Sequence, residues 1–364
     1  MGSKQLSRRD FLKMAALGLG GLTVHPWDNY FNPATALPQV DFPTGERLGR
    51  VLGGQTEVKS LPADDSSTVA VLQEDEVVVC QRQVVGSRPG WFSQNYIETP
   101  QGFVYAPNLQ AVRNQPNQPL SALPDEGGVW VEVSVPYVDL VLSNPPGRSP
   151  WLEHTQHPRL YYSQIMYVDQ IKVSEDGKVL YQVIDRYGSY GDKFWAAAEA
   201  FRPLTAEEMS PLSPDLEDKL VMVRLLQQTL SCYEGSHEVY FCRVSTGGKY
   251  DLDGSPVKKW ATPVGKHTIW RKLVSLHMTG GTTGGGWDLS GIGWTTLFSG
   301  QGMAIHSTFW HNGYGVPRSH GCVNAEPDDA KWVWRWTNPP TPPEPGDVTV
   351  SGMTTSTRVQ VVEE

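Results

Sequence analysis

Short apolar runs separated by turn residues recur along the chain after residue 68. The clearest are residues 69–72 (VAVL), 77–80 (VVVC), 102–105 (GFVY), 165–168 (IMYV), 179–183 (VLYQV) and 229–233 (TLSCY). Runs of this length suit strands better than helices. Gly 36 and Pro 28 together make 64 of 364 residues, which adds turns and disfavours long helices. The sequence therefore predicts a mostly β protein.

Overall charge and hydropathy exclude several classes of function. The formal net charge is −9 and no basic run follows the first 13 residues, whereas a nucleic-acid partner requires clustered Lys and Arg. No later segment offers the roughly 18 apolar residues of a membrane span, so we expect no transmembrane span in the mature protein. With 19% charged and 39% hydrophobic residues, the length predicts about two or three globular domains.

The first 36 residues have the pattern of an export signal. Arg8 and Arg9 precede a weakly apolar stretch at 14–24, which is typical of twin-arginine signals. Ala34 and Ala36 predict cleavage after Ala36. We therefore expect a protein of the cell envelope, in the periplasm or at the outer face of the cytoplasmic membrane and the cell wall. A cytosolic amphipathic helix is the alternative interpretation.

Residues 46–113 have the strand spacing of a small β-barrel. Three of the apolar runs fall here, with an acidic turn at 74–76 between the first two. The late run at 102–105 has a Gly-aromatic-Val-Tyr pattern. This order resembles a bacterial SH3 domain. A generic β-barrel is the alternative.

A segment rich in Pro, Gln and Asn, residues 114–127, predicts a linker to a second β-rich block at 128–204. Two strands around the turn 174–177 (SEDG) predict a hairpin in this block, which is a candidate second SH3-like module. Its tyrosines are candidates for a glycan-binding face, although half-buried strand positions are the more common case. They are Tyr161, Tyr162, Tyr167, Tyr181, Tyr187 and Tyr190.

Residues 217–362 form a third block, again with short strands. Its one convincing helix spans residues 327–336. Pro327 suits the first helical turn, and the two aspartates after it favour the positive end of the helix dipole. Three apolar residues at helical spacing then share one face; they are Ala330, Val333 and Trp334.

Four cysteines would permit two disulfides in an exported protein. They are Cys80, Cys232, Cys242 and Cys322. Cys232 and Cys242 flank a predicted turn at Gly235 and Ser236. With a two-residue turn, Cys232 opposes Val239 and Cys242 points to the other face of the sheet. We therefore expect no bridge between them.

The densest group of reactive side chains surrounds Cys322. It comprises residues 304–310 (AIHSTFW) and 319–324 (SHGCVN). A free thiol has a pKa of about 8.5, so a base such as His306 would be needed to take its proton at neutral pH. The helix that follows adds a modest positive potential, and Gly321 lets amide N–H groups approach an oxyanion. These are the parts of an acyl-transfer site.

Local chemistry alone leaves three other interpretations of Cys322 open. The thiol is a buried structural group, half of a disulfide, or part of a zinc site with His306, His311 and His320. Polar neighbours argue against the first. The spacing is neither C-x2-C nor H-x3-H, which argues against the third. We expect no metal and no cofactor.

Two further segments, residues 244–247 (VSTG) and 262–269 (TPVGKHTI), precede the reactive group. Together with Ile305-His306-Ser307 and the segment 319–324, they closely resemble the signature of the YkuD-type L,D-transpeptidases. The resemblance extends over residues 217–362. An export signal and SH3-like modules are usual companions of such enzymes.

The resemblance implies a β-sandwich-like catalytic domain with one short helix after the nucleophile. It implies a cysteine acyltransferase that cross-links peptidoglycan in cell-wall biogenesis and the maintenance of cell shape. Cys322 would attack the third residue of a donor tetrapeptide stem, expel the terminal D-alanine and form a thioester. The amine of an acceptor stem would then resolve the thioester into a 3→3 cross-link.

The resemblance also assigns roles to single residues. Cys322 matches the nucleophile and His306 the proton donor and acceptor, with the His306 ring oriented by the backbone carbonyl of Ser307. His320 and Gly321 match the turn that forms the oxyanion hole with the Cys322 amide. Four residues are candidates for substrate binding: Asn324, which stands where many relatives have Arg, and Ser319, Trp310 and Arg318.

The glycine-rich stretch 279–300, with Trp287 and Trp294, is a candidate flap over the cleft. A disordered surface insertion is the alternative for the glycines.

Four rival functions remain. In cysteine peptidases of the NlpC/P60 type the nucleophile precedes its histidine, and no histidine follows Cys322 here. A non-catalytic wall-binding protein would not need the pair of His306 and Cys322. An L,D-carboxypeptidase, or an enzyme that attaches proteins to the wall, would use the same site.

Overall fold

The computed structural model describes residues 41–124, 127–153, 155, 157–248, 260–280, 287–351 and 355–364. Over these residues the protein is mostly β, which confirms the predicted fold class. The predicted export signal at 1–36 lies outside the described residues. Within the described part of the chain, no helix has the length and apolar character to cross a membrane.

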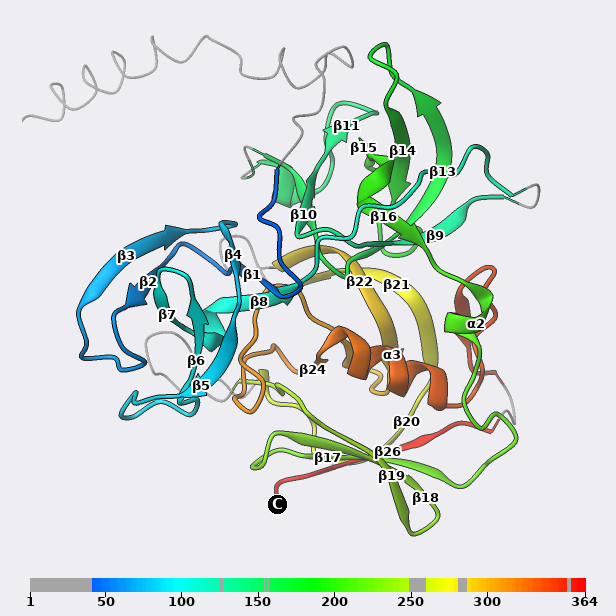
Figure 1. Ribbon diagram of the computed structural model, residues 1–364. Helices are drawn as coiled ribbons and strands as arrows, with labels where there is room; N and C mark the ends of the chain where they lie inside the picture. The colour runs from blue at the N-terminus through cyan, green and yellow to red at the C-terminus, as the bar shows by residue number, and fades with distance from the viewer. Residues whose placement is uncertain are drawn as a thin grey trace, which may run out of the picture.

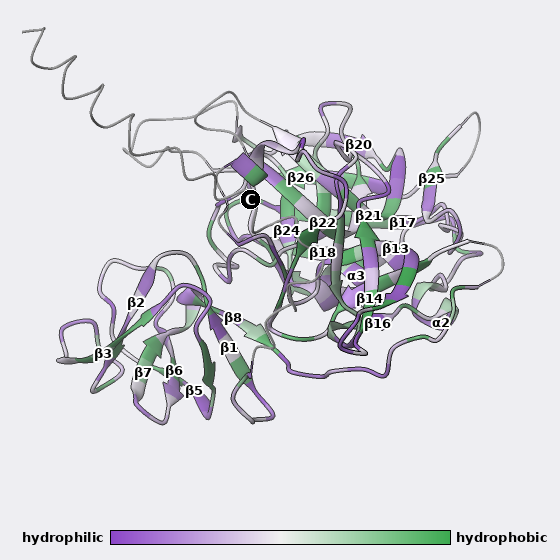
Figure 2. Cartoon of the chain, turned by 90° about the horizontal axis from the view of Figure 1, so that it is seen from above, coloured by the Kyte–Doolittle hydropathy of each residue, from purple (hydrophilic) through white to green (hydrophobic). Residues whose placement is uncertain are grey.

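The N-terminal unit consists of eight strands in two sheets. Their orders are β4-β1-β8 and β3-β2-β7-β6-β5. The strands are β1 (Leu48–Val51), β2 (Gln55–Lys59), β3 (Thr68–Gln73), β4 (Val77–Val79), β5 (Arg82–Val85), β6 (Asn95–Thr99), β7 (Gly102–Tyr105) and β8 (Leu109–Val112), with a 3-10 helix η2 (Ala106–Asn108) before β8. Figure 2, viewed from above, shows this unit beside the larger body that holds the later strands.

Neither sheet of the N-terminal unit closes into a barrel within the described residues, so the expected barrel is open. The chain passes from one sheet to the other between β1 and β2, β3 and β4, β4 and β5, and β7 and β8. Val51, Val58 and Val104 belong to the small apolar core of this unit. Its resemblance to a bacterial SH3 domain stays a prediction.

The second β-rich block contains a six-stranded sheet, of order β11-β15-β14-β13-β9-β16, and the pair β10-β12. The strands are β9 (Val129–Val133), β10 (Tyr137–Asp139), β11 (Val141–Leu142), β12 (Arg159–Tyr161), β13 (Ile165–Val173), β14 (Val179–Ile184), β15 (Lys193–Ala197) and β16 (Phe201–Pro203). The short helices η3 (Pro150–Glu153), η4 (Ala198–Ala200) and α2 (Ala206–Met209) accompany them. The predicted hairpin is confirmed, because β13 and β14 are antiparallel around a turn that contains Gly177.

The segment that joins these two units is extended and attached to the second block. Residues 114–124 contain no helix or strand. The Asn117 N–H donates to the Glu199 carbonyl at 2.8 Å, and the Leu120 N–H donates to the Tyr181 hydroxyl oxygen at 2.7 Å. The described part of the predicted linker is therefore bound to the second block at Asn117 and Leu120.

The tyrosines of the second block do not form one face. Tyr167 and Tyr181 are buried in two different apolar clusters, whereas Tyr190 is exposed. The ring of Tyr187 is stacked on Trp130, with 6.4 Å between the ring centroids. The glycan-binding face expected of these residues is therefore not formed, because most of them serve packing.

The third block has two five-stranded sheets with a helix between them, as expected for the predicted sandwich (Figure 1). The orders are β19-β18-β17-β26-β20 and β24-β23-β22-β21-β25. The strands are β17 (Lys219–Arg224), β18 (Thr229–Glu234), β19 (His237–Arg243), β20 (Gly265–Thr268), β21 (Arg271–Gly280), β22 (Trp287–Leu297), β23 (Ala304–Ser307), β24 (Val323–Ala325), β25 (Asp347–Thr349) and β26 (Arg358–Val362). The helix α3 (Pro327–Trp336) has the predicted bounds.

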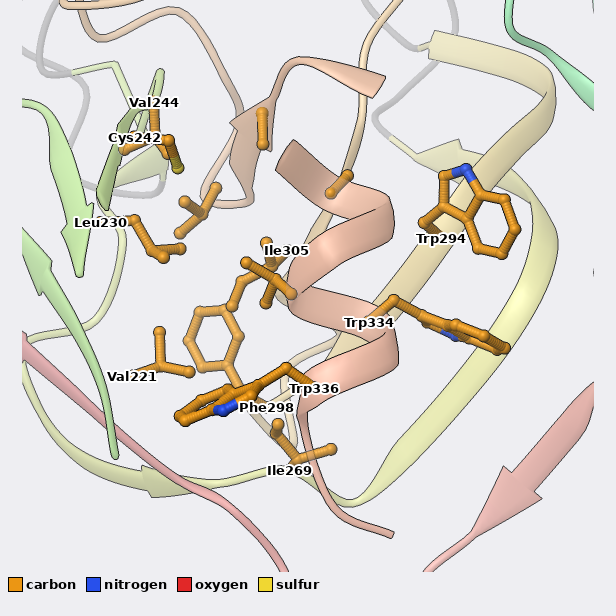
Figure 3. Packing of buried hydrophobic residues seen from close by; sticks show 14 of the residues in the cluster. Val221, Leu230, Cys242, Val244, Ile269, Trp294, Phe298, Ile305, Trp334 and Trp336 are labelled. Atoms are coloured by element: carbon orange, nitrogen blue, oxygen red, sulfur yellow. The ribbon is translucent and has the colours of Figure 1, made fainter. Parts of the chain in front are cut away.

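Apolar side chains from both sheets meet around α3 (Figure 3). Its predicted face is confirmed, because Ala330, Val333 and Trp334 are all buried. The same cluster includes Trp130 and Ile165 of the second block. The second and third blocks therefore share one hydrophobic core.

Two buried lysines hold the C-terminal end of α3. Lys219 on β17 donates from Nζ to the Trp336 carbonyl at 2.7 Å, and Lys272 on β21 donates to the Thr337 carbonyl at 2.6 Å. Carbonyls at the end of a helix carry partial negative charge, which stabilises these ammonium groups. Each sheet is thus attached to the helix that follows the candidate nucleophile.

The hairpin with Cys232 and Cys242 has the predicted two-residue turn but a different register. A β-bulge after Cys232 shifts the pairing, so Cys232 faces Tyr240 and Cys242 faces Leu230. The predicted pairing with Val239 is wrong, because the extra residue brings both cysteines to the same buried face. Both are free thiols in the structure.

Two glycines on β22 let the second block pack closely on the third. A Cβ at Gly293 would lie 2.7 Å from Ile165 Cδ1, and one at Gly291 would lie 3.0 Å from Met166 Sδ. Gly291 also has a φ of +66°, which favours glycine. The prediction that these glycines belong to a mobile flap is therefore wrong, because they sit in a strand that is packed against β13.

A buried Asp–His–Asp cluster joins the same two blocks. Nδ1 of His277, on β21, lies 2.9 Å from Asp185 Oδ2, and Nε2 is hydrogen-bonded to Asp288 on β22. Asp288 also accepts from the Trp151 N–H at 3.0 Å. Burial lowers the pKa of His277, but the hydrogen bonds and charges of the two carboxylates outweigh it and raise the pKa to about 9. The imidazole is therefore a cation at neutral pH.

We expect the free energy of unfolding to fall as the pH rises from 6 to 9. The folded-state pKa of His277, about 9, exceeds the usual value of 6.5, so the folded state holds a proton that the unfolded state releases in this range. The stabilisation is complete below pH 6.5, amounts to about 3 kcal/mol, and is mostly lost by pH 9. Urea unfolding at several pH values measures it. His277→Gln should show a flatter pH dependence, and an equal slope in both proteins would contradict this role of His277.

Candidate active site

The candidate nucleophile and base stand on neighbouring parallel strands. β23 pairs with β24 so that Ile305 lies opposite Val323 and His306 opposite Asn324. Cys322 directly precedes Val323, which places it level with Ala304. Because side chains alternate between the two faces of a sheet, Cys322, Asn324 and His306 share one face. The register thus brings together residues that are 16 positions apart.

The His306 ring is held in one tautomer. Its Nδ1 lies 2.8 Å from the Ser307 carbonyl oxygen, which confirms the predicted contact. Because a carbonyl oxygen only accepts, Nδ1 carries the proton and Nε2 keeps its lone pair. The residue is 2% exposed, and burial lowers the pKa of His306 to about 4 although the Ser307 carbonyl acts in the opposite direction. His306 is therefore a neutral base over the physiological range.

Cys322 is half-buried and has apolar neighbours. It packs against the cluster of Leu273, Leu297 and Ala304. Burial raises the pKa of the Cys322 thiol to about 11, and a backbone hydrogen bond to Ala304 only partly opposes this. The resting pair is thus a neutral thiol beside a neutral imidazole. A thiolate has to form by proton transfer when a substrate is in place.

Side-chain hydroxyls shape the turn before Cys322. The Gly321 N–H donates to Ser319 Oγ at 3.1 Å, and the Ser319 hydroxyl donates to the Cys322 carbonyl at 2.5 Å. Thr262 Oγ1 accepts from the Gly247 N–H at 2.9 Å and donates to the Gly321 carbonyl at 2.9 Å. Gly321 itself has a φ of +120°. Since the Gly321 N–H is already used, it is not available to an oxyanion.

Thr262 was not singled out by sequence reasoning. It opens the segment 262–269, in which no single residue was given a role. The segment 262–269 carries the same family resemblance as the segments around His306 and Cys322. Its first residue, Thr262, could therefore have been considered as part of the site. Ser319 was expected to bind substrate, but the structure uses its hydroxyl inside the turn.

His320 is enclosed by two tryptophans. The ring of Trp287, the first residue of β22, is stacked on it at 4.3 Å, and the ring of Trp260 meets it edge-on at 4.4 Å. Of the predicted flap, residues 281–286 lie outside the described residues. Trp287, which pairs with Gly280 at the loop end of the β21–β22 hairpin, does lie beside the turn that holds His320. Trp294 instead is buried in the core against Trp334, so its predicted role as a flap anchor is wrong.

The segment after β23 carries two more of the predicted residues. The Trp310 ring is stacked near His306, with 5.8 Å between the ring centroids. Arg318 is exposed, and its backbone N–H donates to the Thr246 carbonyl at 2.9 Å. Trp310 therefore lies at the site, and Arg318 lies at its rim beside Ser319.

Asn324 is 1% exposed and touches His311. Its Nδ2 lies 2.9 Å from His311 Nε2, and its Oδ1 has no protein partner among the described residues. Burial lowers the pKa of His311 to about 3, so this imidazole is neutral. The sequence did not pair these two residues. Asn324 lies opposite His306 in the register of β23 and β24, so the two side chains share one face.

The disulfide and the zinc site that were left open for Cys322 have no support in the described residues. All four cysteines are free thiols there. Within the same residues, no three His, Cys, Asp or Glu side chains come together as metal ligands. His306 and His311 instead bind Ser307 and Asn324.

Residues 218–361 match the family model of the YkuD L,D-transpeptidase catalytic domain. No curated protein matches the chain. Among solved structures, the chain is similar to the L,D-transpeptidase of Xylanimonas cellulosilytica, with 22% identity and a TM-score of 0.28 over 45% of this chain and 65% of that one. It is also similar to the Enterococcus faecium L,D-transpeptidase, with 22% identity and a TM-score of 0.30 over 40% of this chain and 50% of that one. L,D-transpeptidase 3 of Mycobacterium tuberculosis is also similar, with 14% identity and a TM-score of 0.29 over 55% of this chain and 92% of that one.

The chain thus spans 65% and 50% of the length of the first two of these structures. The identities and TM-scores of these solved structures are too low to support an argument about function. The likeness of residues 218–361 to the YkuD family rests on the family model, which agrees with the resemblance stated from the sequence.

Proposed function

We propose that the protein is a peptidoglycan L,D-transpeptidase that makes 3→3 cross-links, since residues 218–361 match the family model of the YkuD L,D-transpeptidase catalytic domain. The observation that carries the proposal is the register of β23 and β24, which sets the Cys322 thiol and the free Nε2 of His306 on one face. Among the described residues, no other cysteine shares a sheet face with a histidine whose tautomer is fixed by a hydrogen bond.

The first half of the reaction is acylation. His306 Nε2 takes the thiol proton while Cys322 Sγ attacks the carbonyl carbon of the third residue of a donor stem. The oxyanion of the tetrahedral intermediate accepts from backbone N–H groups of the turn, with the Cys322 amide as the principal donor. When the C–N bond breaks, the imidazolium gives its proton to the leaving D-alanine amine. A thioester remains on Cys322.

The second half transfers the acyl group to an amine. The side-chain amine of an acceptor stem attacks the thioester carbon, His306 takes a proton from the attacking nitrogen, and that proton returns to the departing Cys322 sulfur. A new amide and the free thiol result. Because the resting thiol and imidazole are both neutral and buried, the pair is inert until a bound stem peptide completes the site.

Substrate contacts follow from the same geometry. Asn324 shares the face of Cys322 and His306 and is a candidate contact for the donor stem, and Trp310 provides an apolar wall next to His306. Arg318 at the rim is suited to a substrate carboxylate. Ser319 contributes indirectly, because its hydroxyl holds the backbone of Gly321 and Cys322 in the turn. We also propose that the protein is exported through its twin-arginine segment, acts in the cell envelope, and meets glycan through its N-terminal strands.

The test is incubation of the purified protein with a disaccharide-tetrapeptide and mass analysis of the products. Dimers that lack one terminal alanine are expected. Monomeric tripeptide alone would make water the acceptor and the protein an L,D-carboxypeptidase. Transfer to a protein amine, or no turnover, would point to wall-protein attachment or to a non-catalytic wall-binding role.

We expect Gly321→Ala to slow acylation of Cys322 by roughly 10²-fold, because a misplacement of about 1 Å at a reacting group has an effect of this size. The φ of Gly321 is +120°, and a Cβ there would lie 2.8 Å from Met303 Cε. The acylation rate with a carbapenem, followed by mass spectrometry, measures the effect. Gly300→Ala is the control, since a Cβ at Gly300 meets nothing within 4 Å. Wild-type acylation by folded Gly321→Ala would contradict the role of this turn.

A further inference from the structure

The active-site loop that follows β23 is bound by the N-terminal unit. Arg50 on β1 donates from Nη2 to the Phe309 carbonyl at 2.9 Å. Asn312 donates from Nδ2 to the Leu109 carbonyl, at the start of β8, at 2.9 Å. These two bonds flank Trp310. A part of the chain more than 190 residues upstream thus holds the backbone on both sides of this tryptophan.

The Arg50 guanidinium is fixed on every side. The residue is 3% exposed. Nε and Nη2 both donate to Gln110 Oε1, at 3.0 and 2.8 Å, and Nη1 donates to Asp75 Oδ1 at 2.7 Å. Asp75 also accepts from Arg159 of the second block at 2.9 Å. A buried cation with this number of partners has one orientation, and removal of a single partner from such a group is costly.

Aromatic rings extend the junction. The guanidinium lies over the Tyr161 ring at 4.0 Å from its centroid. Tyr161 is stacked on Phe309, with 5.6 Å between the centroids. Phe309 in turn meets the Trp310 ring edge-on at 5.1 Å. The N-terminal unit, the second block and the loop therefore converge directly behind Trp310.

The position of Trp310 decides how far His306 is shielded. Its ring is stacked near the imidazole, and His306 is almost fully buried. Shielding from water disfavours the protonated imidazole, which keeps the base neutral and ready. If the loop moved away, water would reach His306 and its affinity for protons would rise.

We propose that Arg50 is a positioning residue of the catalytic site: through the Phe309 carbonyl it holds Trp310 over His306. The N-terminal unit is then a structural part of the acylation site and not only a spacer or a glycan-binding module. This inference rests on the proposed function for the role of His306 as the base, but the position of the loop is measured separately.

Two variants of the full chain test it, Arg50→Met and Asn312→Ala. Arg50→Met leaves Asp75 paired with Arg159, and Asn312→Ala leaves the interior of the N-terminal unit unchanged. Arg82→Ala is the control, because Arg82 belongs to the same unit but forms an exposed pair with Glu98. Thermal unfolding shows which variants fold. If Arg50→Met does not fold, the result for Asn312→Ala alone tests the proposal.

The primary measurement is the titration of His306 by NMR of 15N-histidine-labelled protein, with its signal identified by loss in His306→Gln. In both variants we expect the midpoint to rise by about one unit or more toward the ordinary 6.5, while Arg82→Ala matches wild type. Tetrapeptide turnover should lose about 10-fold in kcat with little change in KM. An unchanged His306 midpoint in the folded variants would overturn the proposal. Absence of wild-type turnover would instead count against the proposed function, whatever the titration shows.

Discussion

Replacement of Cys322 by alanine is expected to abolish acylation and to lower turnover of the tetrapeptide by about 10⁶-fold, the order of loss seen when a covalent nucleophile is removed. No other described cysteine can replace it. Cys232 and Cys242 are buried, and burial raises the pKa of each thiol far above the ordinary range. Cys80 lies in the N-terminal unit, where burial raises its pKa to about 11. Neither a thioester nor a carbapenem adduct should form in Cys322→Ala.

The matched control is Cys80→Ala, which removes a half-buried thiol away from the site. Its acylation rate should equal that of wild type. The two variants should unfold within about 1 kcal/mol of wild type, since a half-buried thiol contributes little packing. Tripeptide or dimer formed by Cys322→Ala, at a rate near that of Cys80→Ala, would disprove the assignment of the nucleophile.

Replacement of His306 by glutamine is expected to slow acylation by about 10³-fold, within the usual contribution of a general base. The neutral thiol of Cys322, with its pKa raised to about 11 by burial, cannot ionise at neutral pH without an acceptor for its proton. Because burial lowers the pKa of His306 to about 4, the wild-type rate should stay constant as the pH falls from 7 to 5 and decline only near pH 4. Pre-steady-state acylation rates across this range measure it.

His306→Gln should lack this acid limb and should gain rate only at high pH, as the thiol ionises without help. His237→Ala is the control, because His237 is exposed at the tip of the β18–β19 hairpin. A wild-type acid limb near pH 6.5, or an acid limb that persists in His306→Gln, would show that a different group is the base.

Local signals in the sequence were sufficient for the elements that local interactions build. The helix at 327–336 was predicted to the residue, since its proline, its acidic first turn and its apolar spacing all lie within ten residues. The strands around 69–72, 102–105 and 179–183 followed from their apolar runs. The contact between His306 and the Ser307 carbonyl joins adjacent residues, and it too was expected.

Predictions failed where a distant residue decides the outcome. The register of Cys232 depends on a bulge, which the turn residues do not reveal. Gly291 and Gly293 were expected in a flap because glycine permits motion, but here the absence of a Cβ makes room for Ile165 and Met166. Ser319 was expected to face substrate and is instead bonded within its own turn.

The sequence by itself determined the mostly β class, the helix after the nucleophile, and the pairing of Cys322 with His306 as the reactive group. These depend on neighbours in the chain or on a motif of adjacent residues. Only the tertiary structure decided how the group is supported: Arg50 behind Trp310, His311 beside Asn324, and His277 between two aspartates. Each of these contacts joins residues whose separation along the chain says nothing of their distance in space. The close approach exists only after sheets from different units have packed and buried the charges and polar groups between them.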